Sequence, residues 1–202
     1  MMLLLAALLT AAPITLEADP NHSTVSFSVK HMMVTTVRGT FTKFSSTLTF
    51  DKDDLPKSSV VLNVDPASIN TNNEKRDGHL RSPDFFDVQR CPEMTFKSTR
   101  IEKSGDKYKV TGDLNMHCVT RPLTLEAGFT DQPVKGPMGP VYPASATGKL
   151  KRSDWGLTWN KPLESGGVIV SDDVNVELDF EYVPKQVQAK KEVQEETKVK
   201  KN

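Results

Sequence analysis

The chain has 202 residues, the length of one ordinary domain, and its 26 Lys and Arg residues balance its 26 Asp and Glu residues. A formal net charge of zero excludes the strongly basic proteins that bind nucleic acids through phosphates, so we expect no nucleic-acid partner. Thirteen prolines and eleven glycines, together with many Thr, Ser and Val residues, favour strands and turns over helices.

The first twelve residues form an apolar run that ends in small side chains. The run is too short to span a bilayer, lacks a basic start and shows no period-two alternation. We interpret residues 1–12 as a secretory signal peptide with cleavage near Ala12; an ordered apolar strand is the alternative. The signal interpretation predicts a periplasmic or secreted protein.

Most of residues 13–183 alternate apolar and polar side chains with period two, which is typical of strands with one buried face. The alternation is clearest over residues 24–30 and 174–182. Phe41 and Phe44 have opposite parity, so we expect a bulge or a strand end between them. Seven or eight such strands close most economically into one antiparallel barrel with its apolar faces inward.

Small residues cluster among the expected inward positions of neighbouring strands. Because protein interiors pack densely, this cluster has two interpretations. Either the barrel has room for an apolar ligand, or a large side chain from the opposite wall, such as Trp155 or Phe96, fills the gap. The small residues are Gly112, Ala127, Ala144, Ala146 and Gly148.

Residues 72–87 interrupt the alternation with clustered charges and then two adjacent phenylalanines. The Thr-x-x-Glu pattern at Thr71 predicts a helix start with a capping box, and Ser82, which precedes Pro and Asp, predicts a second start. The first segment has almost no apolar face, so we expect a short helical insert that lies across the barrel end, anchored by Phe85 and Phe86.

These stretches carry a family resemblance that spans residues 16–183. The chain resembles the signature of the YceI-like family in Asp19-Pro20-x-His22-Ser23, Val37-Arg38-Gly39, Ala67-Ser68-Ile69 and Arg76-Asp77-x-His79-Leu80-x-Ser82-x-x-Phe85-Phe86-Asp87. Members of this family are similar to extended lipocalins and bind polyisoprenoids or similar long-chain lipids. The resemblance implies an all-β fold: an eight-stranded antiparallel, lipocalin-like barrel with a short helical insert.

The resemblance also favours the ligand interpretation over a filled interior, with an isoprenoid or quinone-like chain in the lumen. The side chains expected to contact the lipid are Phe27, Val29, Phe41, Val64, Phe85, Phe86, Phe96, Val110, Leu114, Leu125, Trp155, Leu157 and Leu178. Polar side chains expected near a head group at the barrel mouth are His31, Arg38, Arg76 and His79. These polar residues could instead belong to structural ion-pair or hydrogen-bond networks.

The sequence has no hydrolase elbow and no phosphate loop, and its four histidines lack metal-ligand spacing. We therefore predict a non-catalytic binding protein with no metal and no cofactor apart from a bound isoprenoid-type lipid. An enzyme that acts on a lipid in the same barrel is the alternative, with His79 beside Asp77 as an acid or base. The oligomeric state is open between monomer and dimer.

The two cysteines are expected to pair. If Ser104–Gly105 is a two-residue hairpin loop, Lys103 lies opposite Asp106, and the same register places Cys91 opposite Cys118. Directly opposed residues can be close enough for a disulfide bond. The family resemblance gives this pairing no support.

The last segment, residues 184–202, has no aromatic residue and many Lys and Glu residues. Because such a segment cannot bury enough apolar surface to fold, we expect a charged, flexible tail. The predicted organisation is a signal peptide at 1–12, a lipid-binding barrel at 13–183 and a tail at 184–202.

Overall fold

A computed structural model describes residues 13–164 and 166–185; the predicted signal peptide and residues 186–202 of the predicted tail lie outside this part of the chain. The strands are β1 (Ile14–Ala18), β2 (Thr24–His31), β3 (Thr35–Phe41), β4 (Phe44–Phe50), β5 (Ser59–Val64), β6 (Ile69–Asn70), β7 (Met94–Ser104), β8 (Lys107–Met116), β9 (Val119–Phe129), β10 (Val134–Gly136), β11 (Gly139–Lys151) and β12 (Val170–Pro184). The helices are α1 (Glu74–Arg81) and the 3-10 turns η1 (Leu55–Lys57), η2 (Pro66–Ser68) and η3 (Arg152–Trp155).

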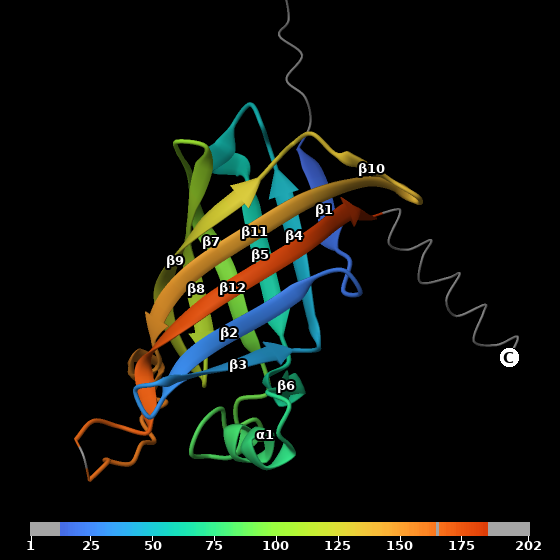
Figure 1. Cartoon of the computed structure of the whole chain (residues 1–202). Coiled ribbons are helices and arrows are strands. Elements are labelled where there is room, and N and C mark those ends of the chain that lie inside the picture. The colour runs from blue at the N-terminus through green and yellow to red at the C-terminus, as the bar shows by residue number, and fades with distance from the viewer. Residues whose placement is uncertain (1–12, 165, 186–202) are drawn as a thin grey trace, which may run out of the picture.

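Eight of these strands form a closed antiparallel barrel (Figure 1). In order around the barrel they are β1, β4, β5, β7, β8, β9, β11 and β12. The ring closes between β11 and β12, where Tyr142 lies opposite Tyr182 and Lys151 lies opposite Asp173. The predicted fold class, an eight-stranded antiparallel barrel with a short helical insert, is therefore confirmed.

The remaining strands extend the wall toward one end of the barrel. The long strand β12 pairs through its last residues with β1 and through its first residues with β2, where Val29 lies opposite Val174. β3 ends at Phe41 and β4 begins at Phe44, so the interruption expected from their opposite parity is present. β2, β3 and β6 continue the paths of β1, β4 and β5, so this part of the barrel wall extends further toward α1 (Figure 1).

Helix α1 lies across this end of the barrel (Figure 1), and its start differs from the prediction. The N-cap is Asn73, whose side chain accepts a hydrogen bond from the Arg76 N–H at 3.0 Å. Thr71 is not a cap, because its N–H and its hydroxyl both donate to the buried carboxylate of Asp77. The capping box predicted from Thr71 and Glu74 is therefore wrong.

The predicted second helix start at Ser82 is also wrong. Ser82 instead ends α1: its hydroxyl donates back to the carbonyl of His79 at 2.7 Å. The chain then continues through turns, the first of which is closed by the Phe85 N–H and the Ser82 carbonyl at 3.0 Å. No described helix is long and apolar enough to cross a membrane.

Cys91 and Cys118 form a disulfide bond, with 5.5 Å between their Cα atoms, although the register argument behind the prediction is wrong. Lys103 lies opposite Tyr108, two residues further along than predicted, and an irregularity between Ser98 and Arg100 shifts the register again. Both cysteines lie beyond the ends of β7 and β8. The β8–β9 turn at His117 and Cys118 has positive φ at both residues, and no Gly or Asn marks it in the sequence.

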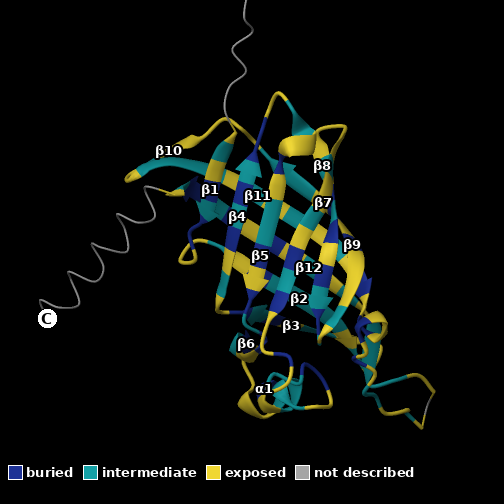
Figure 2. Ribbon diagram, turned by 180° about the vertical axis from the view of Figure 1, so that it is seen from behind, coloured by how far each residue is buried: buried dark blue, intermediate teal, exposed yellow. Residues whose placement is uncertain are grey.

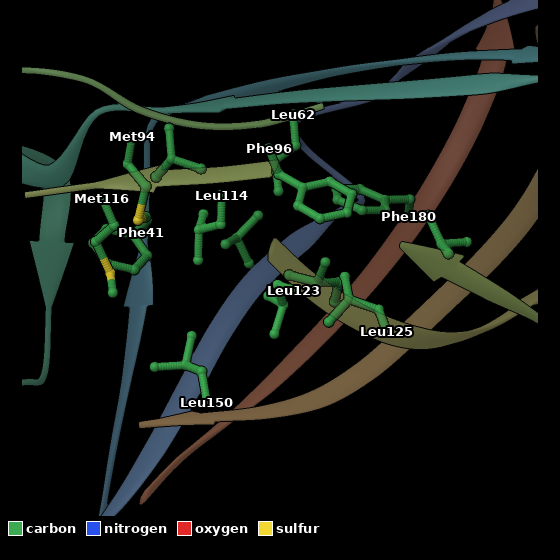
Figure 3. Packing of buried hydrophobic residues seen from close by; sticks show 14 of the residues in the cluster. Phe41, Leu62, Met94, Phe96, Leu114, Met116, Leu123, Leu125, Leu150 and Phe180 are labelled. Atoms are coloured by element: carbon green, nitrogen blue, oxygen red, sulfur yellow. The ribbon is translucent and has the colours of Figure 1, made fainter. Parts of the chain in front are cut away.

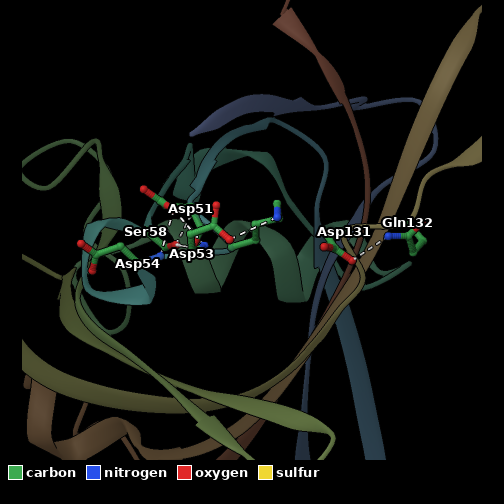
Figure 4. Close-up of polar contacts among 7 residues, drawn as sticks. Asp51, Asp53, Asp54, Ser58, Asp131 and Gln132 are labelled. Carbon is green, nitrogen blue, oxygen red and sulfur yellow. Dashed lines mark hydrogen bonds and ion pairs between the residues drawn. The ribbon is translucent and has the colours of Figure 1, made fainter. Parts of the chain in front are cut away.

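Buried and exposed residues alternate along the barrel strands, as the sequence pattern predicts (Figure 2). Leucine and phenylalanine side chains from different strands, among them Leu62, Phe96 and Leu125, converge inside the barrel (Figure 3). The β4–β5 turn at the end remote from α1 is held by Asp51, whose carboxylate accepts the N–H groups of Asp53 at 3.0 Å and Asp54 at 2.9 Å (Figure 4).

The end of β12 sets the boundary of the barrel domain slightly beyond the predicted one. Pro184, assigned to the tail by the sequence, lies opposite Leu16 in the β1–β12 ladder. Lys185 pairs with Glu17, with 3.2 Å between Nζ and Oε1. The β1–β12 ladder therefore includes the first residue of the predicted tail.

Candidate functional site

The barrel interior contains two apolar cavities. The larger, of about 280 Å³, lies toward α1, and the smaller, of about 80 Å³, lies toward the other end of the barrel. We call them the large chamber and the small chamber. Four side chains border both and form a layer between them: Leu62, Phe96, Leu125 and Leu178. The large chamber is close in size to the smaller ligand pockets of proteins, which start at about 300 Å³.

Most residues that the sequence places around a lipid line the large chamber. They are Phe27, Val29, Phe41, Val64, Phe85, Phe86, Phe96, Leu114, Leu125, Leu157 and Leu178. Val110 borders the small chamber instead. Side chains alternate between the two faces of a strand, so the parity of each strand correctly identifies the residues that face the interior.

Trp155 borders neither chamber, contrary to its expected place beside the lipid. It is 2% exposed, and its Nε1–H donates to the carbonyl of Leu114 at 2.9 Å, so the indole is a fixed part of the wall. The tryptophan that lines the large chamber is Trp159. The two differ because η3 turns Trp155 back onto β8, and the sequence does not indicate this turn.

The small inward residues have two different roles. A Cβ built on Gly112 would lie 2.5 Å from the Phe96 ring, and one on Gly148 would overlap Leu125. At Gly112 the interpretation that Phe96 fills the gap is therefore confirmed. Ala144 and Ala146 line the small chamber, so only part of the small-residue cluster provides open space.

Three aromatic rings pack together at the α1 end of the large chamber. The ring centroid of His79 lies 5.0 Å from that of Phe85 and 4.8 Å from that of Trp159, and Phe85 lies 5.2 Å from Trp159. His79 Nε2 is 2.7 Å from the carboxylate of Asp84, and both side chains are partly exposed. The acidic partner of His79 is thus Asp84, because the Asp77 carboxylate bonds to Thr71.

The other three residues predicted at the mouth divide into two groups. His31 and Arg76 line the large chamber. Arg76 is held by Thr71, whose hydroxyl and carbonyl accept its Nε–H and Nη2–H at 2.7 Å each. Arg38 is exposed and lines neither chamber. Its neighbours Val37 and Gly39 face inward, and alternation therefore turns Arg38 outward.

Arg152 also lines the large chamber, in addition to the polar residues predicted from the sequence. Its side chain is almost fully buried, and its guanidinium carbon lies 6.0 Å from the centre of the Phe85 ring. Burial lowers the pKa of Arg152, and the charge of Asp172 acts in the opposite direction. The sequence does carry one signal for this position: Arg152 follows Leu150 by two residues, and Leu150 faces inward at the end of β11, so alternation predicts an inward side chain at Arg152.

The arrangement offers an apolar volume with polar groups at one end. Within residues 13–164 and 166–185, no group of three or more His, Cys, Asp or Glu side chains is placed to hold a metal ion. The chemistry that the large chamber supports is burial of an apolar chain, with His31, Arg76, His79 and Arg152 near a polar end.

Comparisons with known proteins agree with this fold. The YceI-like domain model matches residues 16–182. A UPF0312 protein of Staphylococcus aureus is 36% identical over 167 residues, which cover 81% of this chain and 94% of the relative. The crystal structure of Burkholderia cenocepacia BcnA has a TM-score of 0.70 at 24% identity, over 81% of this chain and 98% of that one.

A polyisoprenoid binding domain from Saccharophagus degradans, implicated in plant cell wall breakdown, has a TM-score of 0.59 at 15% identity, over 85% of this chain and 99% of that one. At such identities the two solved structures establish the fold alone. The domain match and the staphylococcal relative each span most of this chain. The chain therefore belongs to the YceI-like family.

Proposed function

We propose that this protein binds a long apolar lipid chain without chemical conversion and sequesters or carries it with the tail in the large chamber. The observation that carries the proposal is the cavity of about 280 Å³ enclosed by inward apolar side chains from most strands of the barrel. An empty apolar volume of this size destabilises a fold, so a bound tail provides a physical reason for it.

The size of the large chamber sets the scale of the interaction. If a methylene group takes the ~30 Å³ that a water molecule takes in the liquid, about nine such groups fill 280 Å³. At about 0.8 kcal/mol for each buried methylene, their burial contributes roughly 7 kcal/mol before the cost of association. A longer isoprenoid or quinone-like chain would need the small chamber as well, or would extend out of the mouth.

Two further observations support this proposal. The Saccharophagus domain of the same fold is described as polyisoprenoid binding. The enzyme alternative paired His79 with Asp77, whereas His79 pairs with Asp84, and these two side chains are 39% and 53% exposed and not enclosed in a dry site. The lipid class rests on the family resemblance, and the non-catalytic role rests on the apolar lining.

Extraction of the purified protein with organic solvent, followed by mass spectrometry, tests for a bound lipid.

Titration with decanol tests whether the apolar tail lies in the large chamber. Val176→Trp should weaken decanol binding at least tenfold, because the larger side chain takes up space in the large chamber that the tail would occupy. Each methylene group that is displaced costs about 0.8 kcal/mol of binding free energy. The matched control is Ala144→Phe, which adds volume to the small chamber alone. Unchanged decanol binding by a folded Val176→Trp variant would contradict the proposal.

We also propose that the protein is exported to the periplasm or secreted. The apolar run at residues 1–12 and the Cys91–Cys118 bond support this, because disulfides persist mainly in oxidising compartments. Cell fractionation with N-terminal sequencing tests it. An exported form that starts close after Ala12 is expected, and a purely cytosolic protein that retains Met1 would contradict it.

A further inference from the structure

We propose that the lipid head group is an anion, a carboxylate or a phosphate, and that Arg152 binds it at the α1 end of the large chamber. This inference rests on the proposed lipid binding and goes beyond it by fixing the charge of the head group and the residue that recognises it.

Arg152 has the features of a prepared anion site. It lines the large chamber and is only 6% exposed. Its Nε–H donates to the carbonyl of Ser171 at 3.0 Å, and its Nη1–H donates to the carbonyl of Leu157. Both acceptors are neutral main-chain groups. Among the residues that the structure describes, Nη2 has no hydrogen-bond acceptor and no carboxylate forms an ion pair with the guanidinium.

The surroundings of Arg152 make this incomplete pairing costly. Leu157 and Phe85 line the same chamber, so the guanidinium lies beside an apolar space in which unpaired charge is poorly stabilised. The same surroundings strengthen its attraction for an anion that enters, because the effective dielectric constant is low. The planar guanidinium also matches the spacing of carboxylate and phosphate oxygens.

The charges around the large chamber have one sign. Arg76 and Arg152 line it, and no Asp or Glu does. Asp77, which accepts from Thr71, and Asp172, which accepts the N–H and hydroxyl of Ser153 and whose charge acts to raise the pKa of Arg152, both lie outside the lining. An anionic head group therefore meets two guanidinium groups without a carboxylate from the chamber wall to repel it.

Three probes with the same ten-carbon tail test the head group: decanol, decanoate and decyl phosphate, titrated into the delipidated full-length protein at neutral pH. A charge-assisted hydrogen bond should make at least one anion bind about tenfold or more tightly than decanol. Decanoate and decyl phosphate distinguish the two anion classes. Equal affinity for all three overturns the inference and leaves lipid binding intact, whereas binding of none overturns the proposed function itself.

Arg152→Met tests the residue, because it keeps an unbranched side chain and removes the charge. The ratio of anion to decanol affinity should fall from about ten or more to near one. Arg38→Met removes the same charge from the outer face and should keep the ratio of the original protein. Arg152→Lys, which retains the charge, should keep part of the preference if Arg152→Met folds poorly. A preference that survives in both Arg152 variants at full strength overturns the assignment to this residue.

Discussion

The ring of Phe96 occupies the space beside Gly112 in which a side chain would otherwise lie. A Cβ built on Gly112 would be 2.5 Å from Cζ of Phe96, and it would also be 2.5 Å from the backbone carbonyl oxygen of Lys97. Phe96 in turn belongs to the layer between the two chambers. The absence of a side chain at Gly112 therefore fixes where the phenyl ring divides the lumen.

Phe96→Leu should join the two chambers and lengthen the tail that the protein accepts. In a series of n-alkanols, affinity should keep rising for about two or three more carbons, because the small chamber adds about 80 Å³ at ~30 Å³ per group. Phe44→Leu is the matched control, since Phe44 lines neither chamber. A plateau at the same chain length in both variants would show that Phe96 is not the barrier.

Gly112→Ala should destabilise the barrel, because the backbone oxygen of Lys97 cannot move aside without disturbing the β7–β8 ladder. We expect the free energy of unfolding to fall by about 1–3 kcal/mol, as for other overpacked sites. Gly78→Ala is the control: its Cβ meets nothing within 4 Å, and Ala in a helix should add up to about 1 kcal/mol. Denaturant unfolding of both variants measures the difference, and equal stabilities would contradict the clash.

The sequence predicts the barrel and most of the large chamber because both depend on strand parity. Alternation identifies the inward residues of the barrel, and the mismatch between Phe41 and Phe44 marks the real break between β3 and β4. Arg38 could also have been placed correctly, because its neighbours Val37 and Gly39 face inward.

What the sequence does not predict lies where the chain leaves the strands. Trp159 lines the large chamber in place of Trp155 because η3 turns the chain, and propensities do not fix that turn. Arg152 shares the inward parity of Leu150, but its hydrogen-bond partners are the carbonyls of Ser171 and Leu157, which only the folded loop brings to it. The hairpin register failed because the two loop residues are Gly105 and Asp106, between Ser104 and Lys107, and not Ser104 and Gly105; the irregularity after Ser98, which leaves no mark in the sequence, then shifts the register again.

The hydroxyl groups of Tyr182 and Ser46 lie 2.6 Å apart, and both side chains are buried. Tyr182→Phe should lower the free energy of unfolding by about 1–3 kcal/mol, because it leaves the Ser46 hydroxyl buried without its partner. Ser46→Ala is the matched single change. The double variant should lose less than the sum of the two, and strict additivity would show that the bond contributes nothing.

Stability should fall at alkaline pH because burial raises the pKa of Tyr182 to about 12, although the hydrogen bond with Ser46 acts to lower it. An unfolded tyrosine titrates near pH 10, so the stabilisation is complete below about pH 10 and is lost as the pH rises through about 12. The loss amounts to at most about 3 kcal/mol. Melting temperatures between these pH values should fall more steeply for the original protein than for Tyr182→Phe, and parallel curves would contradict the assignment.

Reduction of the Cys91–Cys118 bond should lower the melting temperature by an amount on the order of 10 °C. The bond closes a loop with a sequence separation of 27, for which the chain-entropy model gives about 3–4 kcal/mol. For a domain of this size, each kcal/mol corresponds to about 2–4 °C. The bond also ties the segment that follows the α1 insert to the β8–β9 turn, so its loss should loosen the α1 end of the large chamber.

The double variant Cys91→Ala, Cys118→Ala provides the control for this experiment. Its melting temperature should match that of the reduced protein and should not respond to reductant. Decanol binding should weaken in both, because Phe85 lies at the α1 end of the large chamber in the segment that Cys91 ties down, and its ring packs against Trp159. If reductant lowers the melting temperature of the original protein and of the double variant equally, the effect does not arise from the disulfide, and the predicted stabilisation is wrong.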